Sequence, residues 1–155
     1  MKKSLVALAF FSASVFAGSE VPPNQPMQNT PVVQFGVVDI SSQIAKIAKN
    51  VGLAYSLKNQ NHRLCWTAYN VPFQMQNKVI EVFVTPKASQ FNSEGATVES
   101  SKDKKTHKIT TMVPNNSDSF GRCWRFDDKD PLGTYKVDIQ VNDIIFQTQT
   151  FELVK

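Results

Sequence analysis

Short segments rich in valine, isoleucine and aromatic residues recur along the chain from Val32 onward, and several of them alternate apolar with polar positions. A period of two is typical of strands that bury one face. Clusters of Asn, Pro, Gly and Ser separate the segments, as expected of turns. We therefore predict an all-β, antiparallel sandwich with seven or eight strands. The predicted strands cover residues 32–40, 53–57, 63–71, 79–85, 108–113, 120–127, 134–141 and 144–154.

Residues 41–50 fit no clear strand pattern. Their apolar residues, with Val51, could form one face of a helix that begins behind a serine, but the run is short. We predict at most one short helix of one or two turns at this place.

The clearest local structure is a hairpin over residues 134–154. Its first strand would place four apolar side chains on one face, namely those of Tyr135, Val137, Ile139 and Val141. Asn142-Asp143 supplies residues that tolerate the positive φ of a tight turn. The apolar phase of the return strand slips between Phe146 and Phe151, which predicts a β-bulge.

The N-terminal residues have the features of an export signal. Met1-Lys2-Lys3 is basic, an apolar stretch too short to span a bilayer follows, and Val15-Phe16-Ala17 fits a cleavage site before Gly18. We predict a signal peptide at 1–17, a flexible proline-rich leader at 18–31, and the β-sandwich domain at 32–155. No later segment is apolar for long enough to form a transmembrane anchor. The expected location is the periplasm of a Gram-negative envelope or the extracellular medium.

Charge gives little indication of a partner. The full chain has a formal charge of +4, but cleavage after Ala17 removes two lysines and no acid, which leaves 15 basic and 13 acidic residues. A net charge near +2 favours neither nucleic acid nor a membrane surface. The only short basic run, at 101–108, lacks the aromatic residues that would stack on bases. We expect no nucleic-acid binding.

Two Cys-Trp pairs, Cys65-Trp66 and Cys123-Trp124, lie in two of the predicted strands. In an oxidising compartment two cysteines favour one structural disulfide, which would close a loop of about 57 residues and contribute about 4 kcal/mol. Alternation places both tryptophans in the core and both cysteines on the opposite face. We therefore predict a bridge between strands of one sheet. A metal is the alternative use of two thiols, but no CxxC spacing is present.

Catalytic motifs are absent from the sequence. His62 and His107 lie in polar segments without a nucleophile motif, so we expect solvated loop histidines. The acidic cluster Asp127–Asp130 offers carboxylates for calcium, but it lacks the alternating layout of a calcium loop, and we expect an ordinary turn. We predict no catalytic, cofactor-binding or metal-binding residues and no enzymatic activity.

The closing part of the chain resembles the last strands of bacterial immunoglobulin-like domains. The similarity rests on 124–127, the segment Gly133-Thr134-Tyr135-Lys136-Val137, the Asn142-Asp143 turn and residues 149–154. It also resembles small exported bacterial proteins of uncharacterised function. The resemblance implies an immunoglobulin-like sandwich in the cell envelope. It further implies that Tyr135 acts as a corner tyrosine whose hydroxyl bonds a nearby carbonyl, although core packing alone is an alternative.

Two functions follow as hypotheses. The first is an exported, non-enzymatic domain that binds an unidentified envelope or extracellular protein through its loops, with Phe73, Met75 and Phe91 as candidate contact residues. These residues lie in the predicted loops 72–77 and 90–95. Phe73 and Met75 could instead cover the end of the core. The second hypothesis is a periplasmic or secreted inhibitor of a hydrolase, such as a lysozyme or a protease.

Overall fold

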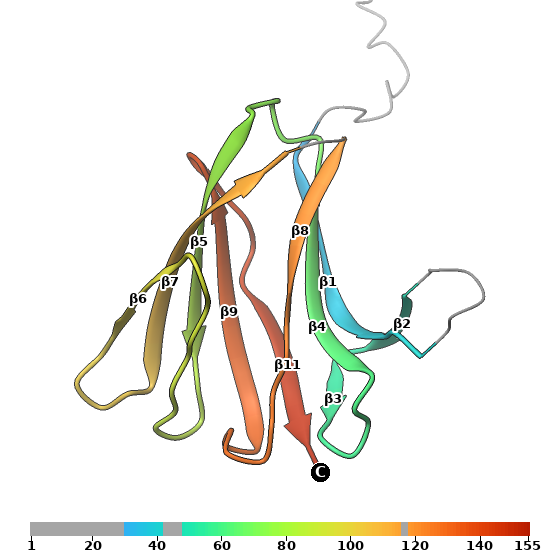
Figure 1. The fold of residues 1–155 in the computed structure, drawn as a ribbon, viewed down its shortest axis with the longest axis vertical. Helices are drawn as coiled ribbons and strands as arrows, with labels where there is room; N and C mark the ends of the chain where they lie inside the picture. The colour runs from blue at the N-terminus through green and yellow to red at the C-terminus, as the bar shows by residue number, and fades with distance from the viewer. Residues whose placement is uncertain (1–29, 42–47, 116–117) are drawn as a thin grey trace, which may run out of the picture.

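The fold is known from a computed structural model, which describes residues 30–41, 48–115 and 118–155. The predicted signal peptide, nearly all of the leader, and residues 42–47 of the predicted helix lie outside the described residues. The described chain forms two facing β-sheets with no helix among its residues (Figure 1). Within this part of the chain, no helix is long and apolar enough to cross a membrane. The predicted all-β sandwich is confirmed.

The smaller sheet has the strand order β2-β1-β4-β8, and every pair in it is antiparallel. Its strands are β1 (Val32–Asp39), β2 (Lys49–Gly52), β4 (His62–Tyr69) and β8 (Ser119–Trp124). Strand β8 therefore forms one edge of this sheet.

The larger sheet has the order β3-β11-β9-β5-β7-β6, with β10 also paired to β9. Its strands are β3 (Ala54–Ser56), β5 (Gln76–Val84), β6 (Thr97–Ser100), β7 (Thr106–Pro114), β9 (Gly133–Val141), β10 (Ile144–Ile145) and β11 (Gln149–Val154). Strand β3 runs parallel to β11, whereas the other described pairs are antiparallel. This parallel pair departs from the fully antiparallel prediction.

All eight predicted strand regions contain strands, and two further strands were not predicted. Strand β2 lies where a helix was considered, and its four residues are all exposed. Strand β6 is also nearly all exposed. Because neither strand buries a face, neither carries the apolar alternation on which the prediction relied.

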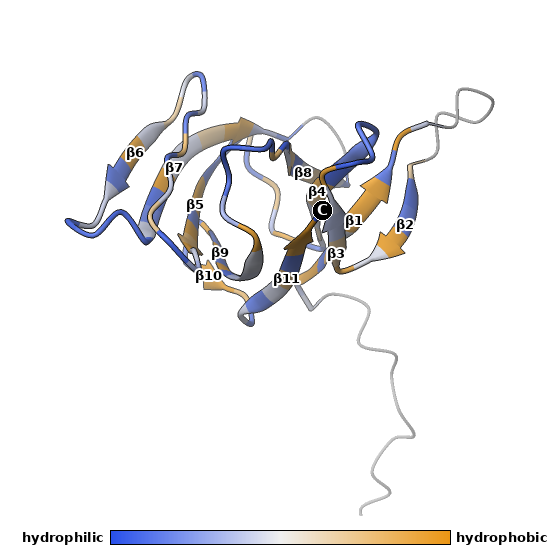
Figure 2. Cartoon of the chain, turned by 90° about the horizontal axis from the view of Figure 1, so that it is seen from below, coloured by the Kyte–Doolittle hydropathy of each residue, from blue (hydrophilic) through white to orange (hydrophobic). Residues whose placement is uncertain are grey.

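Side chains from both sheets meet in one core. Figure 2 shows the larger sheet curving around one side of it, with hydrophobic and hydrophilic residues alternating along the strands. The largest fully buried side chains include Trp66 from the smaller sheet and Tyr135, Phe83 and Phe151 from the larger one. The alternation read from the sequence thus separates the buried face from the exposed face of each sheet.

The predicted C-terminal hairpin is confirmed in detail. The four predicted apolar residues of β9 are buried, and Asn142 has a φ of 53° in the turn. Ile145 pairs with Gln140 but Gln149 pairs with Val137, so the return strand contains one extra residue, as the predicted bulge requires. The Tyr135 hydroxyl donates to the Pro131 carbonyl at 2.7 Å, which is the bond expected of a corner tyrosine.

The sandwich has two ends with different loops (Figure 1). The Phe73 end, at the top of the view, comprises the β4–β5 connection at 70–75 and the β9–β10 turn at Asn142-Asp143. The cleft end comprises the β5–β6 connection at 85–96, the β6–β7 connection at 101–105 and the β8–β9 connection at 125–132.

Candidate functional site

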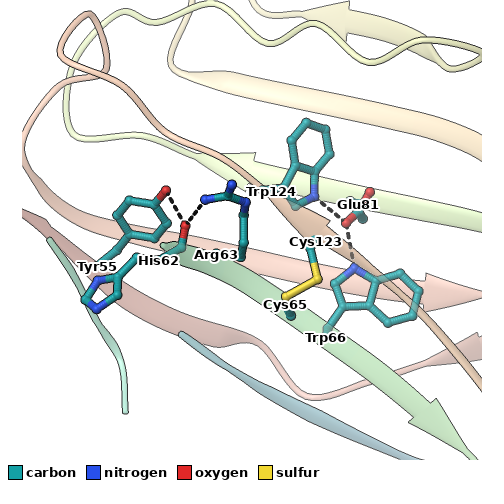
Figure 3. The surroundings of a disulfide bond; sticks show 8 residues. All are labelled: Tyr55, His62, Arg63, Cys65, Trp66, Glu81, Cys123 and Trp124. Atoms are coloured by element: carbon teal, nitrogen blue, oxygen red, sulfur yellow. Dashed lines mark hydrogen bonds between the residues drawn. A yellow bond between two sulfur atoms is a disulfide. The ribbon is translucent and has the colours of Figure 1, made fainter. Parts of the chain in front are cut away.

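The two Cys-Trp pairs lie side by side on adjacent strands of the smaller sheet. Cys65 is the register partner of Cys123, and the two form a disulfide with a Cα–Cα distance of 4.1 Å. Trp66 and Trp124 point to the other side of the sheet and are buried (Figure 3). The predicted arrangement, with a bridge within one sheet and the tryptophans in the core, is therefore confirmed.

Both indoles converge on one buried carboxylate. Trp66 Nε1 donates to Glu81 Oε1 at 2.6 Å, and Trp124 Nε1 donates to the same oxygen at 2.8 Å (Figure 3). Glu81 comes from β5 of the opposite sheet and is fully buried. The carboxylate therefore joins the two sheets through the core.

Arg122 completes this cluster. Its guanidinium pairs with Glu81 Oε2, donates to Ser93 Oγ at 2.8 Å and lies 4.9 Å from the centroid of the Trp124 ring. Burial raises the pKa of Glu81 above its usual range, while Arg122 and the two indoles act in the opposite direction. Every polar atom of the carboxylate has a partner, so the cluster is suited to holding the sheets together.

His107 is a correction to the sequence analysis, which expected a solvated histidine. The residue lies in β7 and is fully buried, with its ring 4.9 Å from that of Phe91. Its Nε2 is 2.9 Å from the Lys104 carbonyl, which can only accept, so Nε2 carries the proton. Ser100 Oγ, 2.8 Å from Nδ1, is then the donor to that nitrogen in the neutral ring.

This tautomer determines what His107 can do for Ser89. Ser89 Oγ lies 2.9 Å from Nε2, a spacing that resembles a nucleophile beside its base. A protonated Nε2 is a donor and does not accept the serine proton. The contact therefore positions the 85–96 connection. His62, at the start of β4, is half-buried, and its Nδ1 accepts from the Ser56 amide at 3.1 Å.

The candidate contact residues fall into two groups. Phe73 is 71% exposed and Met75 is 79% exposed, so these side chains do not cover the core. Phe91 is only 7% exposed and packs against Phe83 and Trp124, so its assignment to a contact surface is corrected. It is a core residue because the 85–96 connection folds inward, held by His107 on one side and Arg122 on the other.

Hydrogen bonds hold the backbone that presents Phe73 and Met75. The Met75 carbonyl accepts from the Asn115 amide at 3.1 Å, and the Gln74 carbonyl accepts from the side chain of buried Asn77. Asn77 in turn accepts from Asn142 Nδ2 at 2.8 Å. The β4–β5 connection is thereby tied to the β9–β10 turn.

Exposed apolar side chains concentrate at the Phe73 end. Of eleven large hydrophobic residues that are exposed in the described part of the chain, six lie in or next to this end: Val32, Tyr69, Phe73, Met75, Met112 and Ile145. Exposed apolar groups that gather on one region of a surface mark interaction sites more often than singly scattered ones do. The sequence analysis named two of the six, Phe73 and Met75, as candidate contact residues because they lie in a polar loop.

The cleft end contains a cavity of about 590 Å³. Phe91, Trp124 and Phe126 form part of its lining, and Lys104, Arg125 and Lys129 supply cationic side chains. The Asp127–Asp130 turn borders it and bonds its own backbone: Asp127 Oδ1 accepts from the Lys129 amide, and Asp130 Oδ2 accepts from the Asp127 amide. No group of three or more metal-ligating side chains occurs in the part of the chain that is described.

Comparison with known proteins identifies the family. The PM0630 β-sandwich domain matches residues 33–154. An uncharacterised protein of Pasteurella multocida (strain Pm70), PM0630, is 30% identical over 162 residues, which cover all of both chains. A solved structure, Pseudomonas fluorescens alkylpurine DNA glycosylase AlkC bound to DNA containing an abasic site analog, is 12% identical. That match covers 81% of this chain and 30% of the other at a TM-score of 0.39, too low to carry an argument. The chain belongs to the PM0630 β-sandwich domain family.

Proposed function

We propose that this chain is an exported, non-enzymatic binding domain that docks a protein partner of the cell envelope or the extracellular space through its Phe73 end. The observation that carries the proposal is the exposure of Phe73 and Met75, at 71% and 79%, on a connection held by buried Asn77. Large apolar side chains on a fixed backbone lose little entropy on binding, and anchors of this kind dominate protein interfaces.

Two further features support the proposal. The disulfide is the kind of bond that persists in oxidising compartments, which agrees with the export signal read from the sequence. The histidines are engaged with backbone carbonyls, amides and serines, and the Glu81 carboxylate is fully paired inside the core. These groups contribute to folding, which supports a role for the exposed Phe73 end in recognition.

Site-specific photo-crosslinking tests this proposal in cells. A photoreactive phenylalanine analogue at position 73 or 75 should give a discrete adduct with one partner, whereas the analogue at Leu132, an exposed position at the cleft end, should not. The double change Phe73→Ser and Met75→Ser should then weaken binding of that partner while the denaturation midpoint is retained. Equal adducts from all three positions, or unchanged affinity of the double variant, would contradict a site at this end.

Inhibition of a hydrolase is a second form of the same binding function. It is favoured by the way the 70–75 connection projects two apolar side chains from a fixed backbone, since inhibitors act by inserting a rigid loop into an active site. Assays of lysozyme and protease activity with the purified domain separate the two cases. Inhibition that is lost in the Phe73→Ser variant identifies the partner as an enzyme.

A further inference from the structure

The disulfide lies on the outer face of the smaller sheet and is open to solvent. Cys123 is exposed and Cys65 is half-buried. Two glycines flank the disulfide. Gly36 of β1 is the register partner of Cys65, and Gly121 of β8 lies two residues before Cys123. The two cysteines line a shallow depression of about 260 Å³. The rate of thiol–disulfide exchange depends on such access to the sulfur atoms.

Access differs between the two sulfurs. Strand β8 forms the edge of the sheet, so Cys123 can be approached from the side that faces away from β4. A Cα–Cα distance of 4.1 Å is typical of an antiparallel register pair whose two residues share no backbone hydrogen bonds. The amide and carbonyl of Cys123 therefore point away from β4, toward the same open edge. On the other side of Cys65, the Asn50 side chain lies over Gly36, where an added Cβ would be 2.9 Å from Asn50 Nδ2. Cys123 is therefore the more accessible sulfur.

The charge around the bridge favours an attacking thiolate. Arg63 lies two residues before Cys65 in β4 and therefore on the same outward side of the strand. Arg63 donates to the backbone carbonyls of Gln60 and His62, and it forms no ion pair with a carboxylate among the described residues. The outward positions of β1, β4 and β8, all of them described, carry no acidic residue. Nearby arginines stabilise thiolates, both the incoming one and the one that leaves.

The contacts that hold β8 on its inner side do not depend on the disulfide. Trp124 and Arg122 remain bonded to Glu81, and Trp66 holds β4 to the same carboxylate. Six register pairs also join β4 and β8. Reduction therefore removes one of several connections between the two strands.

From these observations we infer that Cys65–Cys123 is an exchangeable disulfide in the folded protein, attacked at Cys123 by an external dithiol of the compartment. The thiolate forms a bond to Cys123 Sγ while the bond to Cys65 breaks, and Cys65 leaves as a thiolate. The second thiol of the reagent then displaces Cys123, so the dithiol becomes a disulfide and the protein gains two cysteine thiols. Both forms of the protein are folded sandwiches, and the β4–β8 pair is looser in the reduced form.

Reduction by dithiothreitol under native conditions tests the inference. The rate should rise in proportion to reagent concentration and change little at urea concentrations below the unfolding transition, since direct attack needs no unfolding. Near-ultraviolet circular dichroism from the buried tryptophans should persist after reduction. A rate that levels off with reagent concentration, a steep increase with urea, or loss of the tryptophan signal would each overturn it.

Trapping with reduced glutathione tests which sulfur is attacked. Peptide mass spectrometry after acid quenching should place the mixed disulfide on Cys123; an adduct mainly on Cys65, or equal amounts on both, would refute the assignment. Arg63→Gln should slow reduction by anionic glutathione several-fold at low ionic strength. The matched change Lys136→Gln, an exposed position in the other sheet, should leave the rate unchanged. Equal rates for the two variants would remove the proposed role of Arg63.

Discussion

At the scale of single residues, Glu81 is a buried side chain that joins the two sheets. It accepts from two indoles and pairs with Arg122, all within the core. A buried ion pair adds little net stability over an apolar pair of the same shape, but removing one partner leaves the other charge without compensation. The value of Glu81 therefore lies in fixing one arrangement of the two sheets.

Replacing Glu81 should reveal this dependence. We expect Glu81→Ala to lower the free energy of unfolding by about 3 kcal/mol, because Arg122 and both indoles lose their acceptor. Urea denaturation followed by tryptophan fluorescence measures the change. Glu99→Gln, which removes the exposed pair with Lys108, is the control and should cost less than about 1 kcal/mol. Replacing both Glu81 and Arg122 with methionine should restore the part of the loss that comes from the uncompensated charge of Arg122, and no recovery would contradict the ion-pair explanation.

The pKa of Glu81 also predicts a pH dependence. Burial raises the folded-state pKa above the ordinary value of 4.5, so the folded protein keeps a proton that the unfolded chain has already released. This contribution to stability is complete below pH 4.5 and is lost as the pH rises through the folded-state pKa. The stability of the wild type, relative to Glu81→Gln, should therefore fall with rising pH. Unfolding free energies of both proteins from pH 4 to pH 8 provide the measurement; a constant or rising difference would contradict it.

The sequence indicated some of these residues and missed others for definable reasons. Arg122 lies two residues before Trp124 in β8 and so shares its face, but nothing in the sequence identified its partner. Glu81 gave no signal, because β5 is apolar on both faces: Val79 and Phe83 point inward while Ile80 and Val82 point outward. Phe91 lies in a connection without periodicity, so only its contacts with Phe83 and Trp124 reveal that it is buried.

At the scale of elements, β8 depends on a glycine for its close approach to β4. A Cβ on Gly121 would lie 2.0 Å from the backbone oxygen of Trp66, which cannot move without disturbing the ladder. We expect Gly121→Ala to destabilise the protein by about 2 to 3 kcal/mol. Gly36→Ala in β1 should cost less, because its nearest neighbour is the end of the Asn50 side chain. Thermal unfolding of both variants gives the comparison, and equal losses would argue against the backbone contact as the cause.

The elements found by sequence reasoning are those that bury a face. The hairpin of β9 with β10 and β11 was predicted with its turn and its bulge, because buried and exposed residues alternate along it. The exposed strands β2 and β6 left no such pattern. The parallel pairing of β3 with β11 could not be foreseen either, since three residues of alternation carry no information on direction.

At the scale of the whole molecule, the disulfide and the core contribute separately to stability. Replacing Cys65 and Cys123 with alanine should lower the free energy of unfolding by about 4 kcal/mol, the value expected for a loop of this length. The variant should still fold, because the Glu81 cluster and the β4–β8 ladder remain. Urea titrations of the oxidised protein and the variant measure the difference, with the reduced wild type as control. A reduced protein as stable as the oxidised one would show that the bridge contributes nothing.

The parallel pairing of β3 with β11 has a consequence for the timing of folding. Strand β11 lies between β3 and β9, so residues 149–154 must be present before Tyr55 and its neighbours gain a place in the larger sheet. A chain emerging from the ribosome would therefore hold this sheet incomplete until β11 is synthesised, because contacts between distant segments form late. The position of one short strand thus couples completion of the larger sheet to the synthesis of residues 149–154.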